Sequence, residues 1–164
     1  MLIMNAMRVL FTLLFLVMAS ALPSAAAPTV KVINFTADWC PNCQILNPRL
    51  DEAISAFEAG SVERIDMDVT GIRRDTPLVE KGQIQAELIQ LAHEHQVRYL
   101  IDWYGGITGI AVAVAADTGE PLGCFMRPMK AKDIEKRLNL AKILAEKGKP
   151  GTRQPDALNC PVLK

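Results

Sequence analysis

The chain has 164 residues, half of them apolar, and its 18 lysines and arginines equal its 18 aspartates and glutamates in number. A chain of this length can bury the core of one ordinary domain. The balanced charge excludes the basic surface of a typical nucleic-acid-binding protein, and it gives no reason to expect an anionic membrane as a partner. Composition alone leaves enzymes, binding modules and structural domains open.

Residues 1–27 differ in composition from the rest of the chain. They carry one charge, Arg8, followed by an apolar run over 9–19 and the small residues Ala25-Ala26-Ala27. This order predicts a cleaved secretory signal peptide. An uncleaved signal that anchors the protein is the less favoured alternative, because the apolar run is well short of the ~20 residues of a spanning helix. We expect a periplasmic or secreted protein without a stable membrane span after cleavage.

The other 137 residues show alternating strand and helix patterns. In chain order, the predicted elements are a strand over 29–36, a helix over 41–58, a strand over 62–69, a loop over 70–82, a helix over 83–97, strands over 109–116 and 122–127, and a helix over 131–146. Residues 98–106, which include Trp103 and Tyr104, fit neither pattern. The order β-α-β-α-β-β-α predicts one α/β domain over 28–146, with a central mixed sheet flanked by helices, and a C-terminal tail over 147–164.

Two of the predicted strands have different expected environments. Residues 109–116 are continuously apolar, which is typical of a central strand covered on both faces. The strand over 122–127 lies between Pro121 and Pro128, which predicts a position at the edge of the sheet, where a missing N–H donor is tolerated.

The residues that carry chemistry are Trp39-Cys40-Pro41-Asn42-Cys43, between the first strand and the first helix. Two cysteines three apart on one helical turn lie within the ~4.4–6.8 Å Cα separation that a disulfide needs. Cys40 would lie at the helix N-terminus, where free N–H groups favour a thiolate, and Cys43 would be the shielded partner. Structural zinc sites use the same spacing but normally need a second ligand pair, and Cys124 and Cys160 are isolated. The motif predicts redox chemistry.

Around this motif the sequence resembles the thioredoxin superfamily, over roughly residues 29–144. Phe35-Thr36-Ala37-Asp38-Trp39-Cys40 is similar to the family's strand that leads into its redox motif, and Pro48 matches a proline in its first long helix. Met67-Asp68-Val69-Thr70 is similar to the C-terminal domain of the periplasmic thiol:disulfide interchange transporter. The resemblance implies the thioredoxin fold, with Cys40 as nucleophile and Cys43 as resolving thiol.

Three features depart from the family pattern. Asn34 stands where the family has a buried Asp that helps to move the proton of the resolving thiol, and an amide cannot do this. Thr108 is the nearest match to the family's cis-proline, which faces the cysteines and helps to exclude metal. A cis bond before a residue other than proline costs ~2.5–4 kcal/mol, so we expect a trans bond before Thr108. Residues 98–105 look like an insertion beside this loop.

The residues next to the cysteines are expected to tune them or to contact substrate. Trp39 either forms part of a substrate surface or serves packing alone. Pro41-Asn42 offers dipoles but no charge, so this dipeptide does not indicate where the reduction potential of the protein lies within the family's range of about −270 to −120 mV. Similarity to the reductase domain favours reduction or isomerisation. Trp103 and Tyr104 either line a groove over the motif or pack under the inserted loop.

Cys124 and Cys160 are expected to form a structural disulfide between the edge strand and the tail. If the cysteines of the motif pair with each other, two cysteines remain in a compartment where disulfides persist. The alternative is a buried free Cys124, with Cys160 unpaired or paired to another chain.

The sequence thus predicts an exported thiol–disulfide oxidoreductase that acts on protein thiols and disulfides and exchanges electrons with a redox partner protein. No cofactor is expected. One alternative is a metal-binding module that holds copper or zinc with Cys40 and Cys43. Another is a non-catalytic interaction domain in which the Cys40–Cys43 disulfide stays closed.

Overall fold

The computed structural model describes residues 27, 29–153 and 160. The predicted signal peptide, apart from its last residue, therefore lies outside the described residues. The described elements are β1 (Val30–Thr36), α2 (Pro41–Ile54), β2 (Val62–Asp68), α3 (Leu78–Glu94), α4 (Arg98–Tyr104), β3 (Ile110–Ala115), β4 (Pro121–Met126) and α5 (Ala131–Lys147). In this part of the chain, no helix is both long enough and apolar enough to cross a membrane.

The four strands form one mixed sheet in the order β2-β1-β3-β4. β1 pairs with β2 in parallel, whereas β3 runs antiparallel to both β1 and β4. All six residues of β3 are buried, which confirms that the continuously apolar segment is a central strand. β4 lies at the edge, as Pro121 and Pro128 predict, although it begins at Pro121 itself and ends at Met126. The predicted α/β class with a mixed sheet is confirmed.

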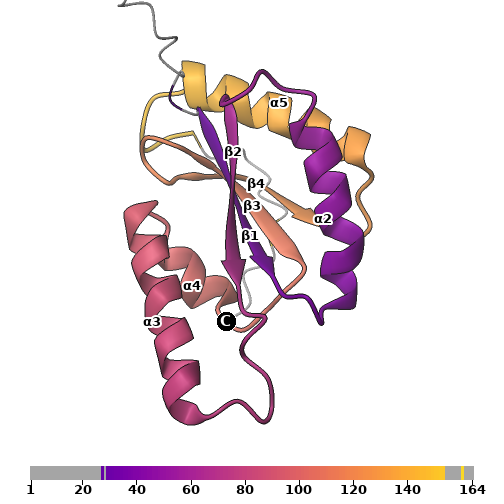
Figure 1. The fold of residues 1–164 in the computed structure, drawn as a ribbon. Helices are drawn as coiled ribbons and strands as arrows, with labels where there is room; N and C mark the ends of the chain where they lie inside the picture. The colour runs from indigo at the N-terminus through magenta and orange to yellow at the C-terminus, as the bar shows by residue number, and fades with distance from the viewer. Residues whose placement is uncertain (1–26, 28, 154–159, 161–164) are drawn as a thin grey trace, which may run out of the picture.

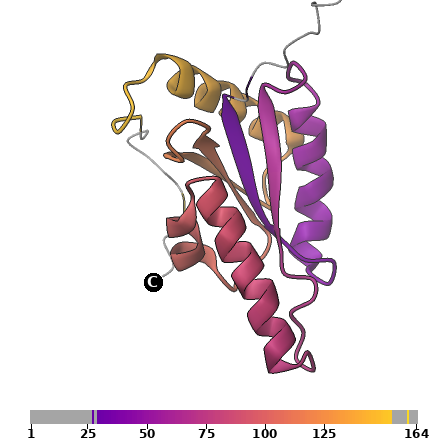
Figure 2. The same ribbon diagram turned by 60° about the vertical axis from the view of Figure 1, so that its left-hand side comes forward.

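Helices cover both faces of the sheet (Figure 1). α2 and α5 pack on one face through a cluster that includes Leu46, Leu50, Ile134 and Leu138. α3 and α4 lie on the other face, as the rotated view in Figure 2 also shows. Spacings of four residues within α2 and α5 place these leucines and isoleucines on single helical faces, which accounts for the burial. The fold thus has three layers.

The predicted boundary between the loop over 70–82 and the helix over 83–97 is wrong, because α3 already begins at Leu78 and ends at Glu94. Pro77 is the N-cap residue, and its carbonyl accepts the N–H of Lys81 at 2.9 Å, which closes the first helical turn. Gly82 suggested a loop, but one glycine costs a helix only about 1 kcal/mol. The helix predicted over 41–58 also ends early, with Ser55 as its C-cap.

Residues 98–106, which fit neither pattern, contain the short helix α4, so the element order becomes β-α-β-α-α-β-β-α. Its aromatic residues serve packing. The ring of Tyr104 is fully buried and meets Phe35 edge-on at a centroid distance of 5.7 Å, and Trp103 meets Tyr99 edge-on at 5.0 Å. Of the two roles considered for Trp103 and Tyr104, the structure shows packing.

The segment after α5 is attached to the turn between β3 and β4 by Arg153, which is 6% exposed. Its guanidinium donates to both carboxylate oxygens of Asp117, at 2.5 and 2.9 Å, and to the carbonyl of Gly148 at 3.1 Å. The hydrogen bond from Arg153 lowers the pKa of Asp117, and the N–H of Gly151 is the main cause of the lowered pKa of Glu120. Part of the predicted tail is therefore packed on the domain.

Candidate active site

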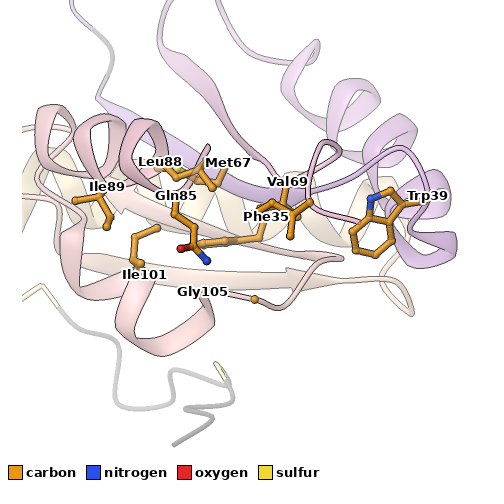
Figure 3. A pocket seen from close by; sticks show the side chains of 11 residues that line it. Phe35, Trp39, Met67, Val69, Gln85, Leu88, Ile89, Ile101 and Gly105 are labelled. Atoms are coloured by element: carbon orange, nitrogen blue, oxygen red, sulfur yellow. The ribbon is translucent and has the colours of Figure 1, made fainter. Parts of the chain in front are cut away.

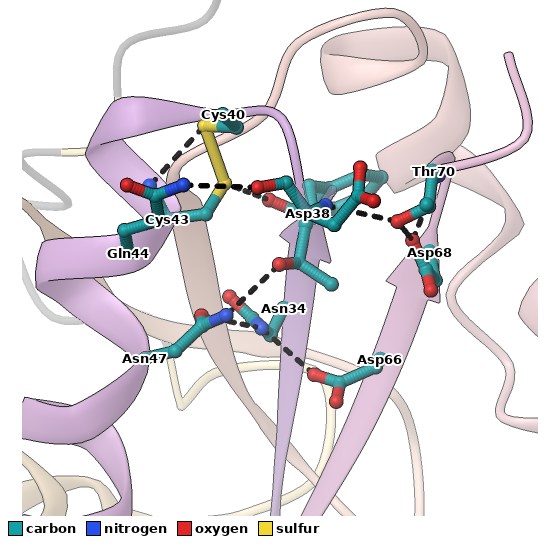
Figure 4. Close-up of a disulfide and its surroundings, with 11 residues drawn as sticks. Asn34, Asp38, Cys40, Cys43, Gln44, Asn47, Asp66, Asp68 and Thr70 are labelled. Atoms are coloured by element: carbon teal, nitrogen blue, oxygen red, sulfur yellow. Dashed lines mark hydrogen bonds between the residues drawn. A yellow bond between two sulfur atoms is a disulfide. The ribbon is translucent and has the colours of Figure 1, made fainter.

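Cys40 and Cys43 form a disulfide at the start of α2, with Cα atoms 5.2 Å apart (Figure 4). Cys40 is the N-cap residue of the helix, and Pro41 follows at its first position. Pro41 suits this place because the first helical N–H has no intrahelical partner and proline has none to lose. The predicted helix start at the motif is confirmed.

The N–H of Cys43 donates to the Sγ of Cys40 at 3.2 Å. Such a bond, at the positive end of the helix dipole, stabilises a thiolate at Cys40 when the disulfide is open. It thus acts on the sulfur that would attack a substrate. Pro41 and Asn42, which lie between the two cysteines, are exposed, whereas Cys40 itself is 4% exposed.

Cys43 has a different environment. Both cysteines are buried, with Cys40 4% and Cys43 1% exposed, but the Sγ of Cys43 lies 3.9 Å from the backbone carbonyl of Phe35. A carbonyl oxygen accepts a hydrogen bond from a thiol but repels a thiolate, so this contact favours the neutral form of Cys43. The arrangement separates an activated sulfur at Cys40 from a protected one at Cys43.

The loop after β2 holds the residues that precede Cys40. The hydroxyl of Thr70 accepts the N–H of Asp38 at 2.9 Å, and the carbonyl of Thr70 accepts the indole N–H of Trp39 at 3.1 Å. Arg73 and Asp38 form an ion pair at 2.9 Å at the same place. These contacts hold the Trp39 ring beside Cys40 with 42% of the residue exposed. Trp39 therefore presents an apolar surface next to the nucleophile.

Gly109, at the entry to β3, was missed in the sequence analysis. A β carbon at this position would lie 3.6 Å from the Sγ of Cys40, and the residue has a φ of +83° that favours glycine. Its N–H donates to the carbonyl of Phe35 at 2.8 Å. Thr108 thus belongs to a loop that lies against the motif, and the bond before it is trans, as expected, since the described residues include no cis bond.

Asn34 lies below the motif on β1 and is fully buried. Its side-chain amide donates to Asp66 at 2.7 Å and to Asn47 at 3.1 Å, and Asn47 in turn donates to Thr36 at 3.0 Å. The oxygen of Asn34 has no hydrogen-bond partner among the described residues. A carboxylate therefore lies next to the buried amide, supplied by the neighbouring strand, in which Asp66 is in register with Asn34.

Cys124 and Cys160 are placed away from the motif. Their Cα atoms are 5.3 Å apart and the two residues form a disulfide across 36 positions of sequence. Both are buried in the core on the α3 and α4 side of the sheet. The structure thus brings together the two cysteines that remain when Cys40 and Cys43 pair with each other. Among the described residues, no group of three or more His, Cys, Asp or Glu side chains is placed to share a metal ion.

Comparison with known proteins gives the family. Residues 23–99, which include β1, the Cys40–Cys43 motif and α3, match the thioredoxin family model. Residues 23–99 thus have the sequence of a thioredoxin domain. The match confirms the resemblance and the fold predicted from the motif. A thioredoxin domain with a Cys-x-x-Cys disulfide at the start of its first long helix makes this protein a thiol–disulfide oxidoreductase.

Solved structures that are similar to this chain cover between 68% and 77% of it. A thioredoxin-family thiol:disulfide interchange protein from Chlorobium tepidum is 20% identical, covers 70% of this chain and is itself covered to 80%, with a TM-score of 0.44. A thioredoxin-related protein from Neisseria meningitidis is 20% identical, covers 77% of this chain and is itself covered to 91%, with a TM-score of 0.40. StoA from Bacillus subtilis is 15% identical, covers 68% of this chain and is itself covered to 84%, with a TM-score of 0.42. No curated protein sequence matches the chain significantly.

Proposed function

We propose that this protein is exported and uses Cys40 and Cys43 to reduce or isomerise disulfides in other proteins. The observation that carries the proposal is the N–H of Cys43 donating to the Sγ of Cys40 at 3.2 Å, because it stabilises the attacking thiolate. Export rests on the composition of residues 1–27, with one charge before an apolar run and an alanine-rich end. Its place of action would be the periplasm or the extracellular medium.

The reaction begins with the open dithiol form. The Cys40 thiolate attacks one sulfur of a substrate disulfide, a Cys40–substrate disulfide forms, and the other substrate sulfur leaves as a thiolate that takes a proton from water. The Cys43 thiol then loses its proton to water and attacks the Sγ of Cys40. The Cys40–Cys43 disulfide closes, and the second substrate sulfur leaves as a thiolate that takes a proton from water. Two electrons have passed from the protein to its substrate.

Turnover by reduction needs a partner that returns two electrons to the closed disulfide. We propose a protein dithiol, either membrane-bound or soluble, as this redox partner. Isomerisation needs no net electron transfer, because the substrate's own released thiol can attack the mixed disulfide and expel Cys40. The exposed Pro41-Asn42 face of the motif is open to both kinds of partner.

Cysteine variants of the mature protein test these roles. Cys40→Ser should lose reduction of a protein disulfide such as that of insulin, and it should form no mixed disulfide at this site. Cys43→Ser should accumulate a mixed disulfide between Cys40 and the substrate, seen as a dithiothreitol-sensitive band shift. Full activity of the Cys40→Ser protein would show that the roles are wrongly assigned.

The reduction potential of the Cys40/Cys43 pair decides the direction. Equilibration with glutathione buffers, followed by alkylation and mass measurement, gives this potential. A value near the about −270 mV end of the family range supports reduction, and one near about −120 mV supports oxidation instead. A pair that never opens under these conditions would favour the non-catalytic domain, and stoichiometric metal in the reduced protein would favour the metal-binding module.

A further inference from the structure

The balanced net charge of the chain conceals an uneven distribution along it. Residues 29–126 carry seven lysines and arginines against fourteen aspartates and glutamates, whereas residues 127–153 carry nine against three. Seven of those nine basic residues lie in α5 or within two residues of its ends. Charges that are separated in this way indicate an electrostatic binding surface, which the total charge does not reveal. The basic surface of this domain is α5.

The face of α5 that points away from the sheet carries both lysines and large aliphatic residues. The inward face of the helix buries Ile134, Leu138, Ala141 and Ala145. Two residues along a helix turn by about 200°, so a position two residues from one of these lies on the outward face. One line of such positions is exposed throughout and consists of Lys132, Lys136, Leu140, Ile143 and Lys147. We call this line the outer stripe of α5.

We infer that the outer stripe of α5 binds the surface of a membrane that contains anionic phospholipid. Its lysines pair with phosphodiester groups, and Leu140 and Ile143 enter the boundary between the headgroups and the acyl chains. The inference goes beyond the proposed function, because it assigns a second surface that does not include the cysteines. It concerns binding at the membrane surface and requires no spanning helix.

The lysines of the outer stripe are available to phosphate groups. Among the described residues, Lys132, Lys136 and Lys147 take part in no ion pair. Lys142 and Glu146 do pair, but both lie beside the stripe rather than on it. A face that is charged only for solubility usually mixes both signs, so that neighbouring charges neutralise each other. The charged residues of the outer stripe are lysines alone, and their positive potential therefore remains.

The aliphatic residues lie in the middle of the outer stripe, where Leu140 is 51% and Ile143 is 49% exposed. Lys136 lies about one turn before Leu140, and Lys147 about one turn after Ile143. The long side chain of a lysine can keep its charge among the headgroups while an aliphatic neighbour is buried more deeply. An acidic protein would need an apolar pocket of matching shape to cover the same two residues, whereas fluid acyl chains surround them. The order of lysine, aliphatic pair and lysine therefore favours a membrane over an acidic protein.

The position of α5 agrees with a membrane partner. α5 packs against β1 and passes the start of this strand in both views (Figure 1 and Figure 2). The predicted signal peptide ends at Ala27, three residues before β1 begins at Val30. Three extended residues span at most about 11 Å, so insertion of the predicted signal peptide into a membrane during the proposed export brings α5 near the bilayer.

Binding through α5 leaves the redox motif away from the lipid. The motif follows the opposite end of β1, which ends at Thr36. The pocket drawn in Figure 3, where Trp39 lies, is on the side of the sheet that α3 covers, whereas α5 covers the other side. A protein bound through the outer stripe thus keeps its motif free to meet other proteins.

Vesicle binding by the mature protein tests the inference. Residues 1–27 are omitted because their apolar run would itself bind lipid. The vesicles consist of phosphatidylcholine alone or of phosphatidylcholine and phosphatidylglycerol in equal amounts, and co-sedimentation measures the partition coefficient. We expect at least about tenfold stronger binding to the anionic vesicles, because three lysines act together at a charged surface. This binding should be lost in about 1 M salt, where the Debye length is about 3 Å.

Two pairs of variants locate the contact. Lys136→Ala should weaken binding to anionic vesicles about fivefold, which corresponds to about 1 kcal/mol for one lysine at a charged surface. Arg74→Ala removes one exposed positive charge from the loop between β2 and α3 and should leave binding unchanged. Leu140→Ser should weaken binding at least about threefold, because one aliphatic side chain no longer enters the acyl region. Leu78→Ser makes the same change on α3, where the leucine is 86% exposed, and should have no effect.

The opposite results would overturn the inference. It is wrong if the wild-type protein binds neither kind of vesicle or binds both equally. It is also wrong if the two α5 variants bind like wild type, or if the control variants weaken binding as much. Binding to polyglutamate without binding to anionic vesicles would identify an acidic protein as the partner instead. A dimer that Lys136→Ala dissociates would identify a second copy of the chain.

Insulin reduction without vesicles separates this inference from the proposed function. Lys136→Ala and Leu140→Ser should reduce insulin at the wild-type rate, because both positions belong to the outward face of α5. Anionic vesicles that bind a wild-type protein unable to reduce insulin would contradict the proposed function alone. Normal insulin reduction by a protein that binds no vesicles would contradict the membrane surface alone.

Discussion

The backbone of Gly109 packs directly against the side chain of Asn42: a β carbon at position 109 would lie 2.6 Å from the Cβ of Asn42. Real β carbons do not approach so closely, so any larger residue must move either the loop before β3 or the first turn of α2. The same first turn carries Cys40 and the N–H that stabilises its thiolate. A displacement of the loop before β3 therefore also displaces the redox motif.

Gly109→Ala should lower both stability and the rate of disulfide exchange. The new side chain adds the clash with Asn42 to an unfavourable φ of +83°, and together we expect a loss of about 1–3 kcal/mol. Gly123→Ala, in β4, is the control, because its β carbon would meet no atom within 4 Å. Urea denaturation measures the two stabilities. Equal midpoints for the two variants would contradict the close approach.

Arg153→Ala should destabilise the domain by about 1–3 kcal/mol at pH 7, because it removes charge-assisted hydrogen bonds to Asp117 from a buried position. Arg74→Ala is the control, since that side chain is exposed and forms no ion pair among the described residues. Thermal unfolding of the three proteins measures the difference. A loss no larger than that of Arg74→Ala would show that the Arg153 contacts do not hold the tail.

The stabilising effect of Arg153 should also depend on pH. The pKa values of Asp117 and Glu120 are both lowered in the folded protein, the first mainly by Arg153 and the second mainly by the N–H of Gly151. A lowered pKa contributes stability above the unfolded value, near 4, which is lost as the pH falls through the folded value. The difference between wild type and Arg153→Ala should therefore shrink below about pH 4. A difference that stays constant from pH 7 to pH 3 would exclude this linkage.

The Cys124–Cys160 disulfide should stabilise the fold without taking part in exchange. It closes a loop across 36 positions, for which the chain-entropy relation gives about 3–4 kcal/mol. Cys160→Ser should lower stability by up to that amount and leave the reactivity of Cys40 in place. Urea denaturation and peptide mapping of the non-reduced protein measure the two properties. Recovery of Cys160 as a free thiol from wild-type protein would refute the pairing.

Thr108→Pro should increase disulfide reduction and decrease uptake of Cu(I) or zinc by the reduced protein. Thr108 directly precedes Gly109, which packs against Cys40, so a change in this loop alters access to both sulfurs. The threonine hydroxyl can also donate to a thiolate, and proline removes this donor. Insulin reduction and metal analysis after dialysis measure the two effects. If neither changes, this loop does not control access to Cys40.

The chemistry of the motif could be predicted from sequence because it is local. The spacing of Cys40 and Cys43 places them on one helical turn, and Pro41 at the first helical position follows from the missing N–H of proline. The central position of β3 was also predictable from its continuous apolar residues, and the edge position of β4 from Pro121 and Pro128. The wrong start predicted for α3 has a local cause as well, because proline and glycine are typical of loops, whereas Pro77 is the N-cap residue of this helix.

The contacts that shape the site depend on residues far apart in sequence. The approach of Gly109 to Cys40 requires β3 to lie beside β1, and the bond from Asn34 to Asp66 requires β1 and β2 to pair in a particular register. The apolar pattern of a strand indicates that it is buried, but several sheet orders and registers bury the same side chains. Those contacts form only when the strands pair in this order and register.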